Sequence, residues 1–292
     1  MTVAVLGPGA VGGVLAVGLV RAGVRVVCIA RPDTAELIAS QGLSLRHGQG
    51  SETVLPEAAS ELIEPVDLLL VTVKAPALED ALNRVKAPAR TVIPLLNGIE
   101  HMQTIRSGLR TVVVAGSVSL LEAYLEQPGV IVQKTPAVVL TLARDADVAT
   151  ADLIARSGAE VRINGSEAEV LWAKLARQAP VAAATALTQR PIGELRSDPE
   201  WRRRLREAVD ETCAVAAHEG VSLAPEAQWE IIDAMPSTLT SSTARDVAAG
   251  RPSELDAITG AAVRAGRRRG VPTPALELLL AEAEERCRAQ SR

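Results

Sequence analysis

The fold of this chain is decided by residues 2–13, which read TVAVLGPGAVGG. The apolar run 2–6 predicts a buried β-strand, and the glycines after it follow the G-x-G-x-x-G pattern. A helix is predicted from Val11 to Ala22 and a second strand after Gly23, so a complete strand–helix–strand unit fits in about 30 residues. In this context the pattern is typical of a turn that binds the pyrophosphate of a dinucleotide.

Each glycine of the pattern has its own task. Gly7 permits the tight turn, Gly9 lets the backbone approach a pyrophosphate, and Gly12 allows the helix to pack closely on the strand. The helix N-terminus supplies unpaired N–H groups to the anion. We therefore expect the cofactor to be bound by Gly7, Pro8, Gly9, Ala10, Val11 and Gly12.

The end of the second predicted strand selects the cofactor. An acidic side chain there would bind the ribose 2′-hydroxyl of NAD, whereas the strand 25–30 is followed by Arg31. A guanidinium fits a 2′-phosphate, so Arg31 predicts NADPH. Lys74, at the end of the predicted strand 67–74, is expected to add a second cation near the adenosine phosphate or ribose. Plain surface charge is the alternative for both side chains.

Short apolar runs separated by helical or turn segments continue to about residue 164. The predicted strands are 3–6, 25–30, 67–74, 91–96, 111–117, 130–133, 137–142 and 161–164. Several are nearly continuous Val, Ile and Leu, as in parallel strands that are buried on both faces. This half therefore predicts an α/β fold with a doubly wound sheet and antiparallel additions near its end.

The strand patterns disappear after Ser166, where Ala, Leu, Arg and Glu follow helical periodicity between scattered prolines. Asn164-Gly165 is a turn dipeptide, and Ser166 with Glu169 forms a capping box at a helix start. We predict a dinucleotide-binding domain over residues 1–164 and an all-helical domain over 165–292.

The composition excludes several classes of function. With 48% hydrophobic and 23% charged residues and a net charge of −4, the 292-residue chain is an ordinary globular protein. Only three Trp and one Tyr are present, which argues against a nucleic-acid partner bound by base stacking. The apolar runs are too short for a membrane span, and a strand at residue 2 leaves no room for a signal peptide. We expect a cytoplasmic protein that does not associate with membranes.

The three Cys and three His residues are scattered without the spacing of a metal site, so no metal is expected. Lysine is also rare, with four residues against twenty-seven arginines. Lys174 nevertheless lies on an apolar helix, beside Leu171, Trp172 and Leu175. A partly desolvated ammonium gives up a proton near neutral pH, and a guanidinium does not. Lys174 is therefore a candidate acid, and a lysine that extends to solvent at a domain junction is the alternative.

Three further positions carry polar side chains where chemistry is expected. Asn97 follows the predicted strand 91–96 at the carboxyl edge of the sheet, where ligands of such sheets bind, although an ordinary Asn-Gly turn explains it equally well. Ser242 precedes a predicted helix. Glu254 lies between Ser253 and Asp256, which read as a capping box, so its position is also explained by a helix N-terminus.

Together these pieces resemble the ketopantoate reductase family, the 2-dehydropantoate 2-reductases. The resemblance covers almost the whole chain and rests on segments 7–13, 71–75, 96–98, 171–175, 193–195, 241–242, 253–256 and 270–274, together with Arg31. It implies an N-terminal Rossmann domain that binds NADPH and a helical C-terminal domain that binds the substrate and supplies the catalytic residues. A 2-oxo acid would be reduced in a cleft between them, within pantothenate biosynthesis.

The resemblance also implies roles for individual residues. Lys174 would be the general acid that protonates the developing alkoxide, with Glu254 holding its ammonium in place. Asn97 would contact substrate and nicotinamide, and Ser242 the substrate carboxylate. Gln178, one turn after Lys174, would face the substrate, and a homodimer is one assembly to expect.

The sequence departs from the family at positions that are usually polar, where it has Gln178, Ala182, Ile192 and Leu239. Because the resemblance covers almost the whole chain, a ketopantoate reductase is nevertheless the first hypothesis. A related NADPH-dependent reductase of a more apolar 2-oxo acid or an imine is the second. A non-catalytic NADPH-binding sensor is the third, and the presence of both Lys174 and Glu254 argues against it.

Overall fold

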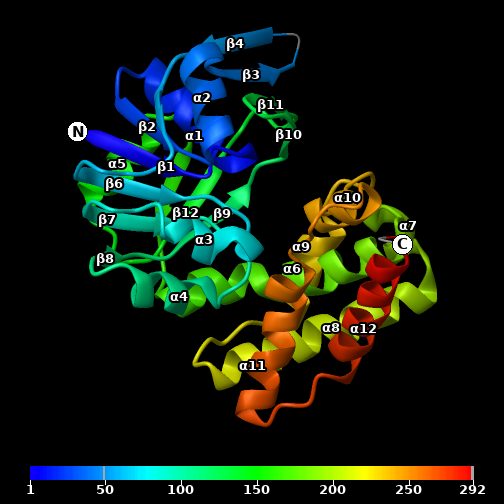
Figure 1. Ribbon diagram of the computed structural model, residues 1–292. Helices are drawn as coiled ribbons and strands as arrows, with labels where there is room; N and C mark the ends of the chain where they lie inside the picture. The colour runs from blue at the N-terminus through cyan, green and yellow to red at the C-terminus, as the bar shows by residue number, and fades with distance from the viewer. Residues whose placement is uncertain (49, 291–292) are drawn as a thin grey trace. The chain divides into compact units, whose positions relative to one another are not determined.

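The chain folds into two compact units. The computed structural model describes residues 1–48 and 50–290. Unit 1 consists of Met1–Leu96 and His101–Val170, and unit 2 of Asn97–Glu100 together with the described residues from Leu171 onward (Figure 1). The change from unit 1 to unit 2 at residue 170 falls inside one continuous helix, α6 (Glu167–Thr188), whereas the sequence placed the boundary at residue 164. The domain limits stay a prediction.

Unit 1 is built around a six-stranded parallel sheet. Its strand order is β5 (Glu57–Ala59), β2 (Arg25–Ile29), β1 (Thr2–Leu6), β6 (Val66–Val71), β7 (Ala89–Pro94) and β8 (Val112–Val113). The central strands are almost fully buried, because helices cover the sheet on both faces. The chain starts in the middle of the sheet and winds outward in both directions, so the predicted doubly wound α/β fold is confirmed.

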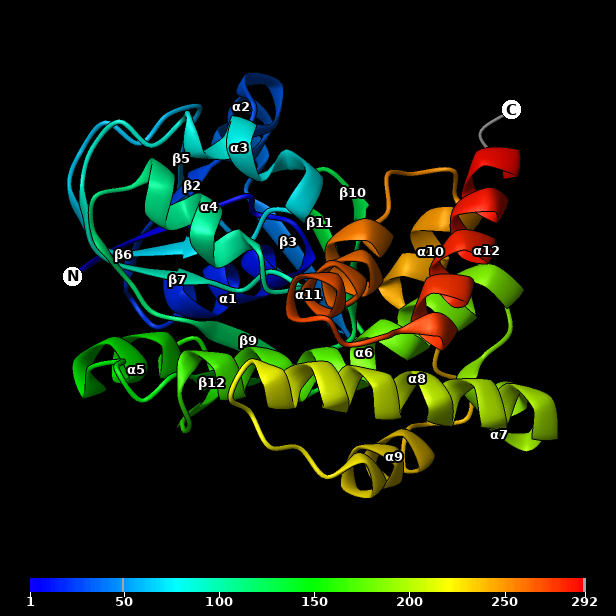
Figure 2. The same cartoon turned by 90° about the horizontal axis from the view of Figure 1, so that it is seen from below.

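The helices of unit 1 connect these parallel strands. They are α1 (Ala10–Arg21), α2 (Pro32–Gln41), the short 3₁₀ turn η1 (Ala75–Ala77), α3 (Leu78–Leu82), α4 (His101–Gly108) and α5 (Val148–Ala155). In Figure 2, α3 and α4 lie on the opposite side of β6 and β7 from α1. Helix α1 is buried along most of its length, because it packs on β1 and β2 and also on strands of a smaller sheet.

Two smaller sheets complete unit 1. One has the order β10 (Ala123–Gln127), β11 (Val130–Gln133), β3 (Leu43–His47) and β4 (Gly50–Val54), and the other β13 (Glu160–Ile163), β12 (Val139–Leu142) and β9 (Gly116–Leu120). Both are mixed sheets, since β11 pairs with β3 and β12 with β13 in parallel. The expected antiparallel pairing does occur, between β10 and β11 and between β9 and β12, but in these separate sheets rather than as additions to the main sheet.

Several strand predictions also differ from the structure. The predicted strand 111–117 is two strands, β8 and β9, which belong to different sheets. Strands β3, β4, β5 and β10 were not predicted, because their many polar, exposed residues lack the continuous apolar pattern of the central strands. The predicted strand 67–74 ends at Val71, so Lys74 lies beyond the strand, at the start of η1.

All of the regular secondary structure described in unit 2 is helical, with loops between the helices. After α6 come α7 (Ile192–Ser197), α8 (Pro199–His218), α9 (Pro225–Asp233), α10 (Ser242–Ala248), the π-helical turn η2 (Asp256–Gly260), α11 (Ala261–Arg269) and α12 (Pro274–Gln290). Helix α8 packs against α7, α9, α11 and α12. The predicted helical second half is confirmed. None of the helices described here has the length and apolar character required to cross a membrane.

The start of α6 shows how local sequence sets a helix boundary. The Ser166 backbone N–H donates to the Glu169 carboxylate at 2.5 Å, and the Glu169 N–H donates to the Ser166 hydroxyl at 3.3 Å. This is the predicted capping box, with both donors satisfied reciprocally. The helix that it starts carries Lys174 two turns later.

Candidate functional site

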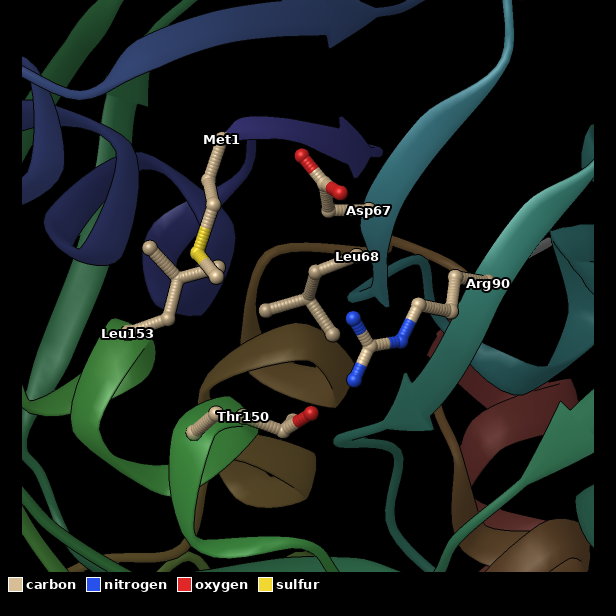
Figure 3. Close-up of a pocket in the computed structure, with 7 residues that line it drawn as sticks. Met1, Asp67, Leu68, Arg90, Thr150 and Leu153 are labelled. Carbon is tan, nitrogen blue, oxygen red and sulfur yellow. The ribbon is translucent and has the colours of Figure 1, made fainter.

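A small cavity in unit 1 is not the functional site. It lies at the amino ends of β1, β6 and β7 and is lined by Met1, Asp67, Leu68, Arg90, Ala149, Thr150 and Leu153 (Figure 3). Its volume of about 10 Å³ is close to that of a single water probe. Parallel sheets bind ligands at the opposite edge, where the strands have their carboxyl ends.

The glycine-rich turn lies at that carboxyl edge, between β1 and α1. Gly7 has a φ of +84°, in the region that favours glycine, and Gly9 is the N-cap of α1. A side chain added at Gly9 would meet only the Gly7 carbonyl oxygen, at 3.9 Å, so the backbone is open to an approaching ligand. The first-turn N–H groups of α1 have no acceptor within the helix. This geometry fits a phosphate group.

Close packing holds the turn in place from behind. A Cβ at Gly12 would lie 2.8 Å from the Gly7 carbonyl oxygen and would collide with the Thr72 hydroxyl. That hydroxyl donates to the Gly7 carbonyl oxygen at 2.7 Å. Thr72 was not predicted as a site residue. The only sign in the sequence is a hydroxyl residue directly after the apolar run 68–71.

The two predicted cofactor cations lie close to the carboxyl edge of the same sheet. Arg31 follows β2 and is the exposed N-cap residue of α2. Lys74 is exposed and follows Val73, whose backbone packs on Gly7. The structure therefore places both cations near the glycine turn, and their roles toward a nucleotide stay predictions.

In unit 2, three of the predicted residues form one chain of hydrogen bonds. The Lys174 Nζ donates to Asn97 Oδ1 at 2.8 Å, and Asn97 Nδ2 donates to Glu254 Oε2 at 2.9 Å. The ammonium therefore reaches the carboxylate through a neutral amide. Lys174 is half-buried, and Glu254 is only 6% exposed.

The surroundings lower the pKa of the Lys174 ammonium to about 8, chiefly because burial removes water from the charged form. The negative charge of Glu254 opposes this effect, and the positive charge of Arg177 adds to it. Arg177 is itself half-buried, and burial lowers its pKa. It donates to the Ala173 carbonyl oxygen and to Gln228 Oε1, at 2.5 and 2.7 Å.

Asn97 reaches this position because Gly98 allows a close approach. Gly98 has a φ of +83°, and a side chain there would collide with the Ala257 carbonyl oxygen in η2. Strand β7 ends at Pro94, so Asn97 lies beyond the strand rather than directly at its end. Asn97 joins unit 2, and its predicted contacts with substrate and nicotinamide stay predictions.

The predicted capping box of Ser253 and Asp256 is wrong. The Asp256 carboxylate accepts hydrogen bonds from Arg264, at 2.5 and 3.3 Å, and a π-helical turn starts at Asp256. The Arg264 guanidinium therefore binds the carboxylate that the capping box would use. Glu254 still lies at the start of a helical stretch, since its carbonyl oxygen accepts from the Ile258 N–H at 3.0 Å, so the helix N-terminus stays an alternative explanation of its position.

The remaining predicted substrate residues lie on α6 and α10. Gln178 follows Lys174 by one turn, and its Oε1 is buried without a hydrogen-bond partner within the described part of the chain. Ser242 is exposed in the first turn of α10, whereas Ser241 caps that helix and bonds the Thr185 hydroxyl at 2.7 Å. The role of Ser242 stays a prediction.

The three apolar positions that replace polar ones also lie in unit 2. Ala182 and Ile192 are buried, at 1% and 0% exposure, and the Ile192 N–H donates to the Leu239 carbonyl oxygen at 2.9 Å. Sequence reasoning missed Arg177, although an arginine within the apolar run of α6 was a visible sign. No group of three or more His, Cys, Asp or Glu side chains suited to a metal ion occurs in the described ranges.

The shifted pKa of Lys174 can be measured without any ligand. Acylation by acetic anhydride, followed across pH by mass spectrometry, should report a Lys174 midpoint near 8. The other three lysines serve as internal references for the reagent. Glu254→Gln should lower the midpoint because the opposing negative charge is lost, and Arg177→Met should raise it. Equal midpoints in all three proteins would contradict this electrostatic account.

Comparison with known proteins finds matches over almost the whole chain. Residues 3–146 match the family model described as Ketopantoate reductase PanE/ApbA, and residues 168–286 match Ketopantoate reductase PanE/ApbA C terminal. A 2-dehydropantoate 2-reductase of Caulobacter vibrioides is 31% identical over 291 residues, which cover 96% of this chain and 97% of that protein.

Two solved structures have the same fold. A PanE/ApbA family ketopantoate reductase from Ralstonia eutropha JMP134 is 32% identical, with a TM-score of 0.89 and complete coverage of both chains. A ternary structure of D-mandelate dehydrogenase with NADH and anilino(oxo)acetate has a TM-score of 0.91 at 22% identity, over 99% of each chain, and shows likeness of fold alone. From the family models and the relatives above 30% identity, this chain belongs to the ketopantoate reductase family, a family of oxidoreductases.

Proposed function

We propose that this protein uses NADPH to reduce a 2-oxo acid to a 2-hydroxy acid, and that its substrate is ketopantoate. The observation that carries the proposal is the hydrogen-bonded chain from Lys174 through Asn97 to Glu254 in a member of this reductase family. A non-catalytic sensor would need no half-buried ammonium with a lowered pKa.

The residues of unit 1 fit a nicotinamide dinucleotide. The open backbone at Gly9 and the N–H groups at the start of α1 would bind the pyrophosphate. Arg31 would bind the 2′-phosphate, with Lys74 as a second cation. When bound, NADPH supplies the hydride that reduces the substrate carbonyl carbon.

Lys174 would handle the negative charge that develops on the carbonyl oxygen. Its ammonium stabilises that charge and donates a proton to give the alcohol. A pKa of about 8 keeps most of the side chain protonated at neutral pH and makes it a stronger acid than an ordinary lysine. Asn97 fixes the direction of the Nζ, and Glu254 holds the amide from its other side.

Polar groups of unit 2 would bind the rest of the substrate. The exposed hydroxyl of Ser242 is proposed to bind the carboxylate. Gln178 Oε1 is a buried acceptor with no partner among the residues that the structure describes, and a substrate hydroxyl would satisfy it. This observation favours ketopantoate over a fully apolar 2-oxo acid.

A second candidate is a reductase of a more apolar 2-oxo acid or an imine. Ala182, Ile192 and Leu239 favour it, because they offer no hydrogen bonds at positions that are usually polar in the family. The fold also serves D-mandelate dehydrogenase, described with NADH and anilino(oxo)acetate. Comparing substrates with and without the hydroxyl separates the two candidates. The homodimer and the cytoplasmic location stay predictions.

Replacing Lys174 tests the proposed function. With ketopantoate and NADPH, Lys174→Ala should lower kcat by about 10²- to 10⁴-fold, because a general acid is lost. NADPH affinity, measured by fluorescence titration, should stay close to that of the parent protein. The surface variant Lys86→Ala is the control. Turnover of Lys174→Ala equal to that of the control would remove Lys174 from the mechanism.

Replacing Arg31 tests the choice of cofactor. The parent protein should prefer NADPH over NADH, because charge-assisted hydrogen bonds to the 2′-phosphate are worth about 1.5 to 3 kcal/mol, roughly a 10- to 150-fold difference. Arg31→Ala should remove most of that preference, and Arg110→Ala, at another exposed arginine of unit 1, should keep it. Equal affinities of the parent for the two cofactors would refute the assignment.

The substrate hydroxyl tests Gln178. Ketopantoate should be preferred over the branched 2-oxo acid that lacks its hydroxyl by no more than about tenfold in kcat/KM, the value of one hydrogen bond. Gln178→Met, which keeps the side-chain volume, should reduce this preference to about one. A preference of several thousandfold, or one that survives in Gln178→Met, would show that other groups recognise the hydroxyl.

A further inference from the structure

The segment Asn97–Glu100 is an unusual part of unit 2, because the elements on both sides of it belong to unit 1. Four residues that leave β7 and return to α4 supply the amide on which the hydrogen-bonded chain depends. Gly98 packs on η2, but a backbone contact alone leaves the end of the segment unattached. The side chain of Glu100 attaches this end of the segment to the rest of unit 2.

Glu100 forms a bidentate ion pair with Arg264 of α11. Arg264 Nε donates to Glu100 Oε1 at 3.1 Å, and one terminal nitrogen donates to Oε2 at 2.7 Å. Arg268, one turn later, adds a weaker bond to Oε1 at 3.4 Å. A planar guanidinium fixes the carboxylate in direction as well as in distance.

The same guanidinium also binds the start of η2. Arg264 donates to the Asp256 carboxylate at 2.5 Å and to the Asp256 carbonyl oxygen at 3.0 Å. Asp256 follows Glu254 by two residues, and Glu100 follows Asn97 by three. One side chain therefore joins the segment that carries the amide to the segment that carries the carboxylate.

We propose that Glu100, Arg264 and Asp256 form a positioning clamp that holds Asn97 and Glu254 at the spacing required to orient the Lys174 ammonium. The consequence for catalysis rests on the proposed function, whereas the consequence for the Lys174 side chain does not. The clamp residues are positioning residues, since their contacts are with one another.

Stability alone does not account for the clamp. The Glu100 and Arg264 side chains are 39% and 37% exposed, and ion pairs of that exposure contribute little to folding. A comparable pair joins Arg269 of the same helix to Glu219 at the end of α8, with two bonds of 3.0 Å and no contact with the segment 97–100. Glu219→Ala is therefore a matched control for Glu100→Ala.

Lys174 acylation tests the clamp without substrate or cofactor. In Glu100→Ala the segment 97–100 should loosen and admit water to the ammonium, so the pKa of Lys174 should rise from about 8 toward its ordinary value. A rise of one pH unit lowers the neutral fraction at pH 8, and hence labelling relative to Lys134, by about fivefold. Glu254 and Arg177, the other charges that act on Lys174, are unchanged in this variant.

Steady-state kinetics of the 292-residue protein provide a second test of the clamp. Glu100→Ala should lower kcat/KM by about 10- to 100-fold, the scale of a small misplacement of a catalytic group, and Glu219→Ala should stay within about twofold. In an Asn97→Ala background, adding Glu100→Ala should lower kcat/KM by less than a further threefold or so, because the clamp acts through Asn97. A general loss of stability would lower activity equally in both backgrounds.

Arg264→Lys keeps the charge but loses the planar fork, and it should reproduce the effects of Glu100→Ala. It also replaces Glu100→Ala if that variant does not fold, as judged by circular dichroism. Unchanged Lys174 labelling in the folded variant, or additive losses with Asn97→Ala, would overturn the clamp. If the parent protein reduces no 2-oxo acid, the proposed function fails, and the labelling experiment still decides the clamp.

Discussion

The carboxamide of Asn97, held between the Lys174 ammonium and the Glu254 carboxylate, is the interaction on which the candidate site depends. A direct ion pair at about 4 Å would stabilise the ammonium by about 4 kcal/mol in surroundings of intermediate dielectric, and would raise its pKa accordingly. The neutral amide orients the Lys174 ammonium while it keeps the charges of Lys174 and Glu254 apart. Burial therefore remains the dominant influence, and the pKa stays near 8.

The amide can act in this way because its two ends differ. Its oxygen accepts from the cation and its nitrogen donates to the anion, so the charges on either side favour one orientation of the side chain. An aspartate at this position would pair with Lys174 and repel Glu254. A glutamine would need a different backbone path, and the left-handed Gly98 with its contact to Ala257 leaves little freedom for one.

The sequence allowed the parallel sheet and the glycine turn to be predicted, because a continuous apolar strand and a G-x-G-x-x-G pattern are local signals. Lys174 was visible for a different reason, as a rare lysine among arginines on an apolar helix. The bridging position of Asn97 was not visible, since 77 residues separate it from Lys174 and 157 from Glu254. The Asp256 carboxylate was misassigned because Arg264 competes with the helix cap for it.

Reaction type and substrate choice depend on different kinds of groups in the molecule. In the proposed function, the reaction type depends on backbone N–H groups, glycines and one lysine, each of which meets a strict geometric demand. In the same proposal, substrate choice depends on a few side chains such as Gln178, Ala182 and Ile192, where a change removes or adds a single hydrogen bond and leaves the helices intact. One hydrogen bond is worth about 0.5 to 1.5 kcal/mol, too little to alter the fold but enough to change the preferred substrate. A member of this family can therefore keep the complete fold while its substrate differs. In the proposed function, the buried Gln178 oxygen, which has no hydrogen-bond partner among the described residues, is what favours a hydroxylated substrate.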